Sequence, residues 1–397
     1  MPLSLIASAF VAAIVGYGST IALVLAAAQA LQATAAETAS WVAAVCLAKA
    51  IGSALLSTWT RVPVVLAWST PGAALIAGTS GIAMPEAVGA FVLAGALIFA
   101  TAAIPLLGRL IAAIPAGIAA AMLAGVLLPF ALEVAKSASN QAALVWPIIA
   151  AFVAVRIASP LYAVIAALVV GVGLVAADQG LAADLSAFTL QPLAFIAPTF
   201  DPGVLLGLGV PLFLVTMASQ NLPGFAVLRA HGYAPPVERA LAVTGLGSSL
   251  AALAGAHTFN MAAITAAICL SDDVHADRTK RWRVGLAYAA FWIVLAFAGP
   301  ILIAIILAMP QAVVATIAGL ALITPLSGAL SEAFADTTHR FPAVVTFFVT
   351  ASGITAIGVG AAFWGLLAGL ILIGLDRILA RRNPAEHSKR PVSRAKP

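Results

Sequence analysis

Three short clusters of polar side chains interrupt the long apolar runs of this 397-residue chain. They are Ser69–Thr70, Ser219–Asn221 and His257–Asn260. Hydroxyl and amide groups supply hydrogen bonds without carrying negative charge, and none of the three clusters contains an acid. Residues of this kind are suited to holding an anion in a site shielded from water.

Two of these clusters are followed by short apolar segments that we expect to be half-helices. In Val62–Gly78 a β-branched run leads to Ser69–Thr70 and then Pro71, which is typical of a helix start. In the second segment Thr258 and Asn260 precede Met261–Leu270, and we expect them to cap a second helix start. Helices that begin at the middle of a membrane direct a positive dipole end there, which favours an anionic substrate.

The remaining cluster and one further polar stretch lie within predicted spans. Ser219–Asn221 stands ahead of Pro223–Gly224, and we expect this pair to kink or break the helix. Gly16–Thr20 occupies a comparable place in the first span, where Tyr17 is an aromatic residue able to pack on a ligand. Polar groups inside a membrane cost free energy unless they are paired or serve a site.

Composition determines the class of protein that positions these groups. The chain is 63% hydrophobic and 8% charged, which excludes a soluble globular protein and predicts an all-α polytopic membrane protein. Long apolar runs do not fit a β-barrel. Cys46 and Cys269 lie inside apolar segments, so we expect small core residues and neither a disulfide nor a metal site. No cofactor is expected.

Segment lengths predict about fourteen spans in two halves of seven, residues 1–178 and 201–380, followed by a basic tail at 381–397. An odd number of spans in each half inverts the second half relative to the first. A twelve-span alternative counts the interrupted units as loops. The expected segments are 4–31, 37–59, 62–79, 84–107, 110–130, 143–157, 160–177, 203–226, 237–254, 257–271, 281–307, 310–330, 340–354 and 357–378.

The charges indicate an orientation. With both termini in the cytoplasm, every Lys and Arg except Lys49 and Lys136 falls on the cytoplasmic side. We therefore interpret the high pI, about 9.6, as a topology signal in a bacterial inner-membrane protein and not as a sign of nucleic-acid binding. The halves also share a pattern, because Ala112–Leu128 and Leu307–Ile323 both have a proline that opens the helix and an Ala-Gly pair near its middle.

Three motifs resemble the benzoate transporter family of benzoate–proton symporters. They are AWSTPGAAL (Ala67–Leu75), MASQNLPGFAVLRAHGY (Met217–Tyr233) and GAHTFNMAAITAAIC (Gly255–Cys269). The resemblance covers essentially the whole chain and implies a fold similar to uracil permease and sulfate-permease-type transporters. That fold is a seven-plus-seven inverted repeat, with the substrate between the third and tenth spans. Its core domain would comprise about 4–107 and 203–307, and its gate domain about 110–177 and 310–378.

Nucleobase transporters of that fold hold their substrate with carboxylates in spans eight and ten. The corresponding positions here lie near Ser219–Gln220 and Phe259–Asn260, which carry no acid. A site without fixed negative charge suits a carboxylate substrate, and the proton-coupling residue cannot be transferred from those relatives. The candidates for that role are His257, whose alternative is a structural histidine, and Glu332, whose alternative is a solvated helix end.

We expect a secondary active transporter that imports benzoate or a similar aromatic carboxylate with protons and is embedded in lipid. Analogy with similar folds suggests a homodimer. The rivals are a transporter of another organic anion or of nucleobases, a channel, and an intramembrane enzyme. Each candidate residue also has a structural reading as a helix cap or packing group. The candidate substrate-binding residues are Tyr17, Ser69, Thr70, Ser219, Gln220, Asn221, Thr258, Phe259 and Asn260.

Overall fold

The computed structural model describes residues 2–104, 106, 109, 114–160, 162–179 and 193–382. Helices dominate, and the strands that the described residues form are very short. In the first half the elements are α1 (Leu3–Gly18), α2 (Ile21–Ala30), α3 (Ala35–Thr60), β1 (Leu66–Trp68), α4 (Thr70–Ala77), α5 (Met84–Ala103), α7 (Ala116–Asn140), α8 (Ala142–Ala158) and α9 (Ala163–Gln179).

The second half has more irregular segments. Its elements are α10 (Pro202–Val204), the π-helix η2 (Leu205–Gly209), α11 (Val210–Thr216), the π-helix η3 (Met217–Asn221), α12 (Leu222–Ala230), α13 (Val237–Ala252), β2 (Phe259–Met261), α14 (Ile264–Leu270), the 3-10 turns η4 (Asp272–Val274) and η5 (Arg278–Arg283), α15 (Val284–Leu307), α16 (Gln311–Ala335), α17 (Arg340–Ala351), the hairpin strands β3 (Thr355–Ala356) and β4 (Val359–Gly360), and α18 (Ala361–Arg382).

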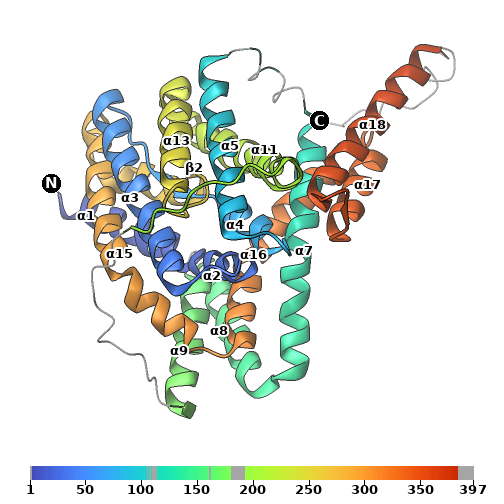
Figure 1. The fold of residues 1–397 in the computed structure, drawn as a ribbon. Helices are drawn as coiled ribbons and strands as arrows, with labels where there is room; N and C mark the ends of the chain where they lie inside the picture. Colours follow the sequence, from blue (N-terminus) through green and yellow to red (C-terminus); the bar gives the residue numbers. More distant parts are fainter. Residues whose placement is uncertain are drawn as a thin grey trace, which may run out of the picture.

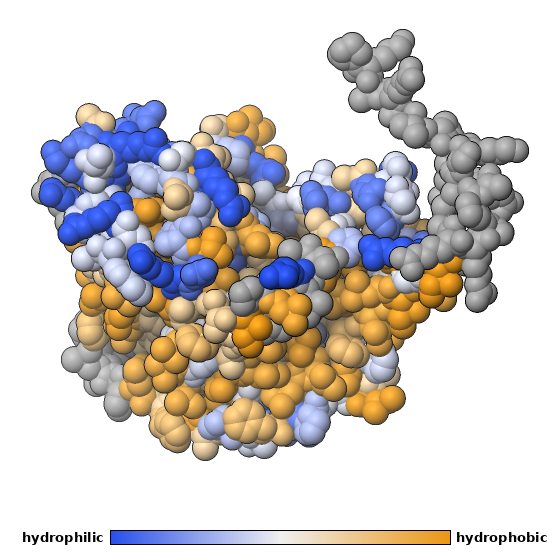
Figure 2. Space-filling view, turned by 90° about the horizontal axis from the view of Figure 1, so that it is seen from above, coloured by the Kyte–Doolittle hydropathy of each residue, from blue (hydrophilic) through white to orange (hydrophobic). Residues whose placement is uncertain are grey.

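The exterior of the molecule confirms the membrane prediction. Eight helical segments of the described chain are long and apolar enough to cross a bilayer, and three shorter apolar helices accompany them. Large apolar side chains such as Ile157, Phe297 and Phe348 stand exposed on the surface. Figure 2 shows hydrophilic residues gathered along one edge of the molecule and hydrophobic ones over much of the rest of that face. Such a surface is stable only against lipid.

The helices pack in two groups (Figure 1). In one, α3 packs on α15, α5 on α13, and α1 on α15 and α14. In the other, α7 packs along α16, while α17 contacts α7 and α18, and α8 lies on α9. As expected from the repeated pattern, α7 begins directly after Pro115 and α16 directly after Pro310.

The two interrupted units have the predicted form of an extended piece followed by a short helix. β1 and β2 pair antiparallel, with Leu66 opposite Met261, Ala67 opposite Asn260 and Trp68 opposite Phe259. α4 starts two residues after β1, and α14 starts three residues after β2. The strand pair satisfies backbone groups that would otherwise be unpaired inside the molecule.

Two spans differ from the expectation. The first is broken, because α1 ends at Gly18 and α2 begins at Ile21. The eighth is not broken at Pro223–Gly224: the helix runs on from η3 into α12, whose first turn accommodates the proline. Gly224 instead permits a close approach, since a Cβ there would lie 2.5 Å from the Cβ of Met261 on β2.

Some expectations fall outside the described residues. These are most of the 178–201 loop, part of the junction between the fourth and fifth spans, and the tail beyond residue 382. The exact count of fourteen spans, the inverted relation of the halves and the division into core and gate domains stay predictions.

Candidate substrate site at the crossing of the interrupted spans

Ser69 is the centre of a buried hydrogen-bond network between the two interrupted units. Its hydroxyl accepts from the Gly72 N–H at 3.1 Å, which caps α4 as predicted, and bonds to Thr216 Oγ1 at 3.1 Å. Its N–H donates to the Thr258 carbonyl at 3.0 Å. Because Ser69 is fully buried, every one of these bonds is made away from solvent. The cap therefore also ties β1–α4 to two other spans.

Thr258 and Asn260 do not cap α14, which corrects the expectation from the sequence. The residue before α14 is Ala263, and no side chain caps this helix. Thr258 Oγ1 bonds to Thr216 Oγ1 at 2.9 Å. The Asn260 carboxamide, oriented to satisfy both groups, accepts from the Ser69 N–H at 3.2 Å and donates to the Met261 carbonyl at 2.9 Å. The extended segment before α14 uses these side chains to hold the other unit.

His257 is a buried structural group in this network. Its Nδ1 accepts from Trp41 Nε1 at 2.9 Å, and its Nε2 lies 3.2 Å from the Ser69 carbonyl oxygen. Because the indole N–H can only donate, Nδ1 must be the acceptor and Nε2 the donor. Both nitrogens are occupied by protein partners, so adding a proton would break the bond to Trp41.

The π-helix η3 places Asn221 and Gln220 in different environments. Asn221 is fully buried, and its Oδ1 accepts from the Met261 N–H at 2.9 Å, which anchors β2. Ser219 is half-buried and donates its hydroxyl proton to the Val215 carbonyl. Gln220 is half-buried, and its amide makes no hydrogen bond to any described residue. π-bulges are frequent at functional sites, and this one contains an amide that none of the described residues engages.

The break in the first span meets the start of α4. Thr20, in the break, bonds through its hydroxyl to that of Thr70 at 2.8 Å. Thr70 is half-buried, and α4, which it begins, packs against α2, α7 and α11. Tyr17 is instead buried, and its ring centroid lies 5.4 Å from that of Trp68 and 6.1 Å from that of Trp292.

Phe259 points into the helix packing behind the strands. It is 1% exposed, and Cβ atoms built at Gly247 and Gly52 would lie 2.6 and 3.4 Å from its ring. The ring is thus wedged between α13 and α3. Ala67 is half-buried, and strand alternation directs it to the face opposite Trp68. Of these two residues Ala67 is the more accessible to a ligand.

The second helix group covers this region. α7 packs against α4 and η3, and α16 packs against α2. Glu332 lies near the end of α16 and is exposed, next to the equally exposed Asp336. That end of α16 is exposed, whereas the strand pair is buried. Glu332 makes no hydrogen bond to the Ser69 network.

Sequence reasoning singled out Lys49 only as an exception to the charge rule, whereas the structure places it beside β1. Its side chain is fully buried on α3, with Nζ 3.8 Å from the ring centroid of Trp68 and 3.1 Å from that of Trp292. No described residue offers it a hydrogen bond. A lone lysine in the middle of an apolar span was the signal in the sequence.

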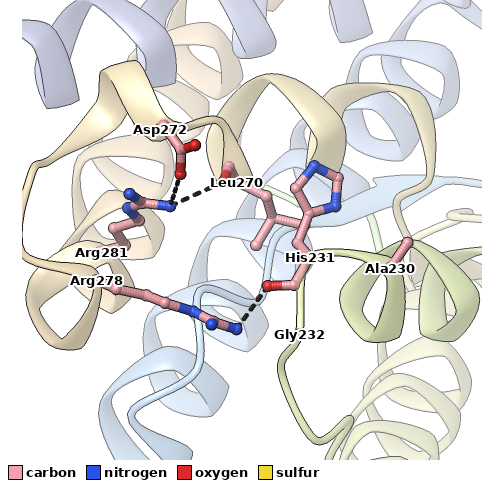
Figure 3. A pocket seen from close by; sticks show the side chains of 7 residues that line it. All are labelled: Ala230, His231, Gly232, Leu270, Asp272, Arg278 and Arg281. Carbon is pink, nitrogen blue, oxygen red and sulfur yellow. Dashed lines mark hydrogen bonds and ion pairs between the residues drawn. The ribbon is translucent and has the colours of Figure 1, made fainter.

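A separate cavity of about 400 Å³ lies at the far end of α14 (Figure 3). Arg281 there binds Asp272 at 2.9 Å and the carbonyls of Leu270 and His275, while Arg278 donates to the His231 carbonyl. Because these guanidinium groups already have protein acceptors, they join the loop after α12 to the loop after α14. We therefore treat this cavity as a structural junction and not as the substrate site.

The central region offers hydroxyl, amide and backbone donors, and no carboxylate among the described residues is buried there. Within the described residues no group of three or more His, Cys, Asp or Glu side chains is arranged to hold a metal. Cys46 and Cys269 are buried and unpaired, as expected for core residues. The polar groups at the strand crossing are therefore suited to a partner that accepts hydrogen bonds.

Comparison with known proteins agrees with this chemistry. Residues 1–375 match the model of the benzoate membrane transport protein family. The chain belongs to that family. It is 32% identical over 371 residues to the benzoate membrane transport protein of Acinetobacter baylyi, covering 93% of this chain and 94% of that protein. It is 39% identical over 375 residues to the inner membrane protein YdcO of Escherichia coli, covering 94% and 96%.

Solved structures show the fold. The structure of SLC26A9 matches with a TM-score of 0.58 at 13% identity, covering 93% of this chain and 65% of that one. The transmembrane domain of the cyanobacterial bicarbonate transporter BicA matches with a TM-score of 0.56 at 13% identity, covering 93% and 98%. The expected likeness to sulfate-permease-type transporters is confirmed at the level of fold. This chain is accordingly a multi-pass membrane transporter and not an enzyme.

Proposed function

We propose that this transporter imports benzoate or a similar aromatic carboxylate together with protons. The observation that carries the proposal is the half-buried amide of Gln220, on a π-helix that contacts β2 at the crossing of the two interrupted spans. None of the described residues bonds to this amide, and none of the described acids is buried there. A carboxylate is a hydrogen-bond acceptor, so donors without competing negative charge favour it. Membership of the benzoate membrane transport protein family supports the aromatic ring.

In this proposal the side chains divide into those that bind and those that position. The carboxylate receives hydrogen bonds from the Gln220 amide and from the N–H and hydroxyl of Thr70, and the ring packs over Ala67. Ser69, Asn221, Thr258 and Asn260 position these groups, because they are fully buried and already bonded to one another or to the strands. Ser219 lies beside Gln220. Tyr17 and Phe259 support the site from behind.

Transport would proceed by alternating access. The group containing α3, α5, α13 and α15, with both interrupted units, moves as a core domain against a gate domain that contains α7 and α16. The boundary between them runs where α7 meets α4 and η3, so a substrate bound there is exposed first on one side and then on the other. The protein lies in the bacterial inner membrane with both termini in the cytoplasm, an orientation supported by the distribution of Lys and Arg.

The test is uptake of labelled benzoate into proteoliposomes, with and without an inward proton gradient. Wild type is compared with Gln220→Ala and with Gln29→Ala, which removes an exposed glutamine on α2. We expect gradient-driven accumulation in wild type and in Gln29→Ala, and a loss of about tenfold in Gln220→Ala, because one hydrogen bond to a charged group contributes about 1.5–3 kcal/mol.

Neutral benzoic acid crosses bilayers unaided, so empty vesicles set the baseline. Uptake equal to that baseline for wild type would overturn benzoate as the substrate. A competition series with other carboxylates, bicarbonate and nucleobases would then identify the substrate class. If Gln220→Ala accumulated as much benzoate as wild type, benzoate would stand as the substrate and the proposed site would be overturned.

A further inference from the structure

Lys49 is a buried basic group that takes no part in the hydrogen-bond network around Ser69. Its Nζ lies over the indole rings of Trp68 and Trp292, at 3.8 and 3.1 Å from their centroids, and makes no hydrogen bond to the described chain. Two other buried polar groups here also have no hydrogen-bond partner among the described residues. They are the Nε1 of Trp292 itself and the hydroxyl of Tyr17, whose ring packs near that of Trp292. We call Lys49, Tyr17, Trp68 and Trp292 the aromatic box.

Two opposing effects act on the charge state of Lys49 in these surroundings. Burial without an acceptor disfavours the ammonium, because no water or carboxylate replaces its hydration. Two indole faces favour the ammonium through cation–π attraction. The titratable groups that face the box are Cys46 on the same helix, Tyr17 from α1, Tyr288 from α15 and His257 before β2. None of these groups is a carboxylic acid. A nearby anion would therefore decide the balance.

The box adjoins the proposed substrate site. Trp68 is the last residue of β1 and directly precedes Ser69, the cap of α4. Its Nε1 donates to the Gly16 carbonyl at 3.1 Å, next to Tyr17 and the break in the first span. Thr20 in that break bonds to Thr70. A carboxylate bound at Thr70 and Gln220 would lie on the other side of β1 from the Lys49 amine.

Other carriers of a transported proton are poorly placed. Both nitrogens of His257 are engaged with Trp41 and Ser69. Glu332 is exposed at the end of α16. Among the described side chains, the only charged residues that are buried are Lys49 and Arg281, and Arg281 is paired with Asp272. Of the charged residues that the structure describes, Lys49 is the one that combines burial in the core with a nitrogen that has no hydrogen-bond partner.

We propose that Lys49 carries the symported proton. This role rests on the proposed function. The empty core crosses with a neutral amine, and the loaded core crosses with an ammonium whose charge balances the substrate carboxylate. The step is protonation of the amine by a proton from the outer solution and its release inside, with no other bond made or broken. Both forms that move through the membrane are then electroneutral, which avoids the cost of moving a net charge.

The first experiment measures proton uptake when benzoate binds to the purified full-length chain in weakly buffered detergent solution. We expect wild type to take up about one proton per benzoate, because binding and protonation are linked. Lys49→Met, which fills the box with an apolar side chain of similar length, is expected to bind benzoate without taking up a proton. Lys136→Met, on an exposed lysine paired with Glu133, should behave as wild type.

The second experiment separates coupling from transport in proteoliposomes. Lys49→Arg should retain benzoate counterflow at equal pH, because its loaded form stays electroneutral, and should lose accumulation driven by a proton gradient, since arginine stays charged throughout. Lys49→Met has no charge to balance the carboxylate and should also lose gradient-driven accumulation. Gradient-driven accumulation by Lys49→Met would overturn the role of Lys49 and leave benzoate symport standing. Absence of benzoate binding and transport in wild type would overturn the proposed function and this role with it.

A third variant keeps the proposal testable if Lys49→Met does not fold. Trp292→Phe preserves an aromatic face but weakens the attraction for the ammonium. We expect the pH at which benzoate-linked proton uptake is half-maximal to fall by about half a unit or more. An unchanged midpoint would overturn the assignment to Lys49, because a proton carried elsewhere would not sense this ring.

Discussion

The two interrupted spans share a shape but use their polar residues differently. In the first, Ser69 caps its own helix through Gly72. In the second, α14 begins at an uncapped alanine, Ala263, while His257, Thr258 and Asn260 all bond to Ser69 or to its partner Thr216. The second unit therefore holds the first in place and leaves its own helix start open. Two segments of matching geometry therefore have different roles: the second unit positions the first.

The strongest test of this asymmetry removes a bond that crosses from the second unit to its neighbours. His257→Leu leaves the Trp41 indole N–H buried without an acceptor, so we expect a loss of about 2 kcal/mol in the free energy of unfolding. The measurement is the thermal unfolding midpoint in detergent, compared between His257→Leu and wild type.

Trp41→Phe is the matched variant for that bond. Alone it should be destabilising, and in the His257→Leu background it should add little, since the bond is already gone. Additive losses in the double variant would contradict a direct Trp41–His257 interaction.

A smaller effect is expected when the first unit loses its own cap. Ser69→Ala removes the hydroxyl that binds Gly72 and Thr216, and should lower stability by about 1 kcal/mol and reduce benzoate affinity. Ser69→Thr keeps a hydroxyl and should retain most of both. If Ser69→Ala matched wild type in unfolding and binding, Ser69 would not be the centre of the network.

The smallest effect concerns the open helix start of the second unit. Ala263→Ser supplies the missing cap, and we expect it to raise stability by about 0.5 kcal/mol. The control is Ala267→Ser, one turn further along α14 on an exposed position, which provides no cap. An equal gain in both variants, or a loss in Ala263→Ser alone, would argue that α14 is not limited by its uncapped first turn.

Much of the fold was predictable because its causes are local. Runs of apolar residues long enough to span a bilayer gave the helices, and Ser69 before Pro71 gave the start of α4. Pro115 and Pro310 likewise marked the starts of α7 and α16. The continuation through Pro223 was not predictable, because it depends on the π-helix η3, which runs directly into the first turn of α12, where a proline is tolerated.

The candidate site was only partly predictable for a physical reason. A polar residue before an apolar run has the same sequence signature whether it caps that run or bonds across to another span, as Asn260 does. Likewise, aromatic residues near the motifs gave no indication of which rings face a ligand, and Phe259 proved to be wedged between α13 and α3.

The sequence by itself determined that the chain is a helical membrane protein, where helices such as α4, α7 and α16 begin, and that its polar clusters lack acids, because hydropathy and helix starts depend on neighbouring residues along the chain. Only the tertiary structure decided that β1 pairs with β2, that His257 is held by Trp41, and that Lys49 lies unpaired between two indole rings. Those relations join residues that are up to about 240 positions apart. They are fixed by which helices pack together, and no local pattern encodes them.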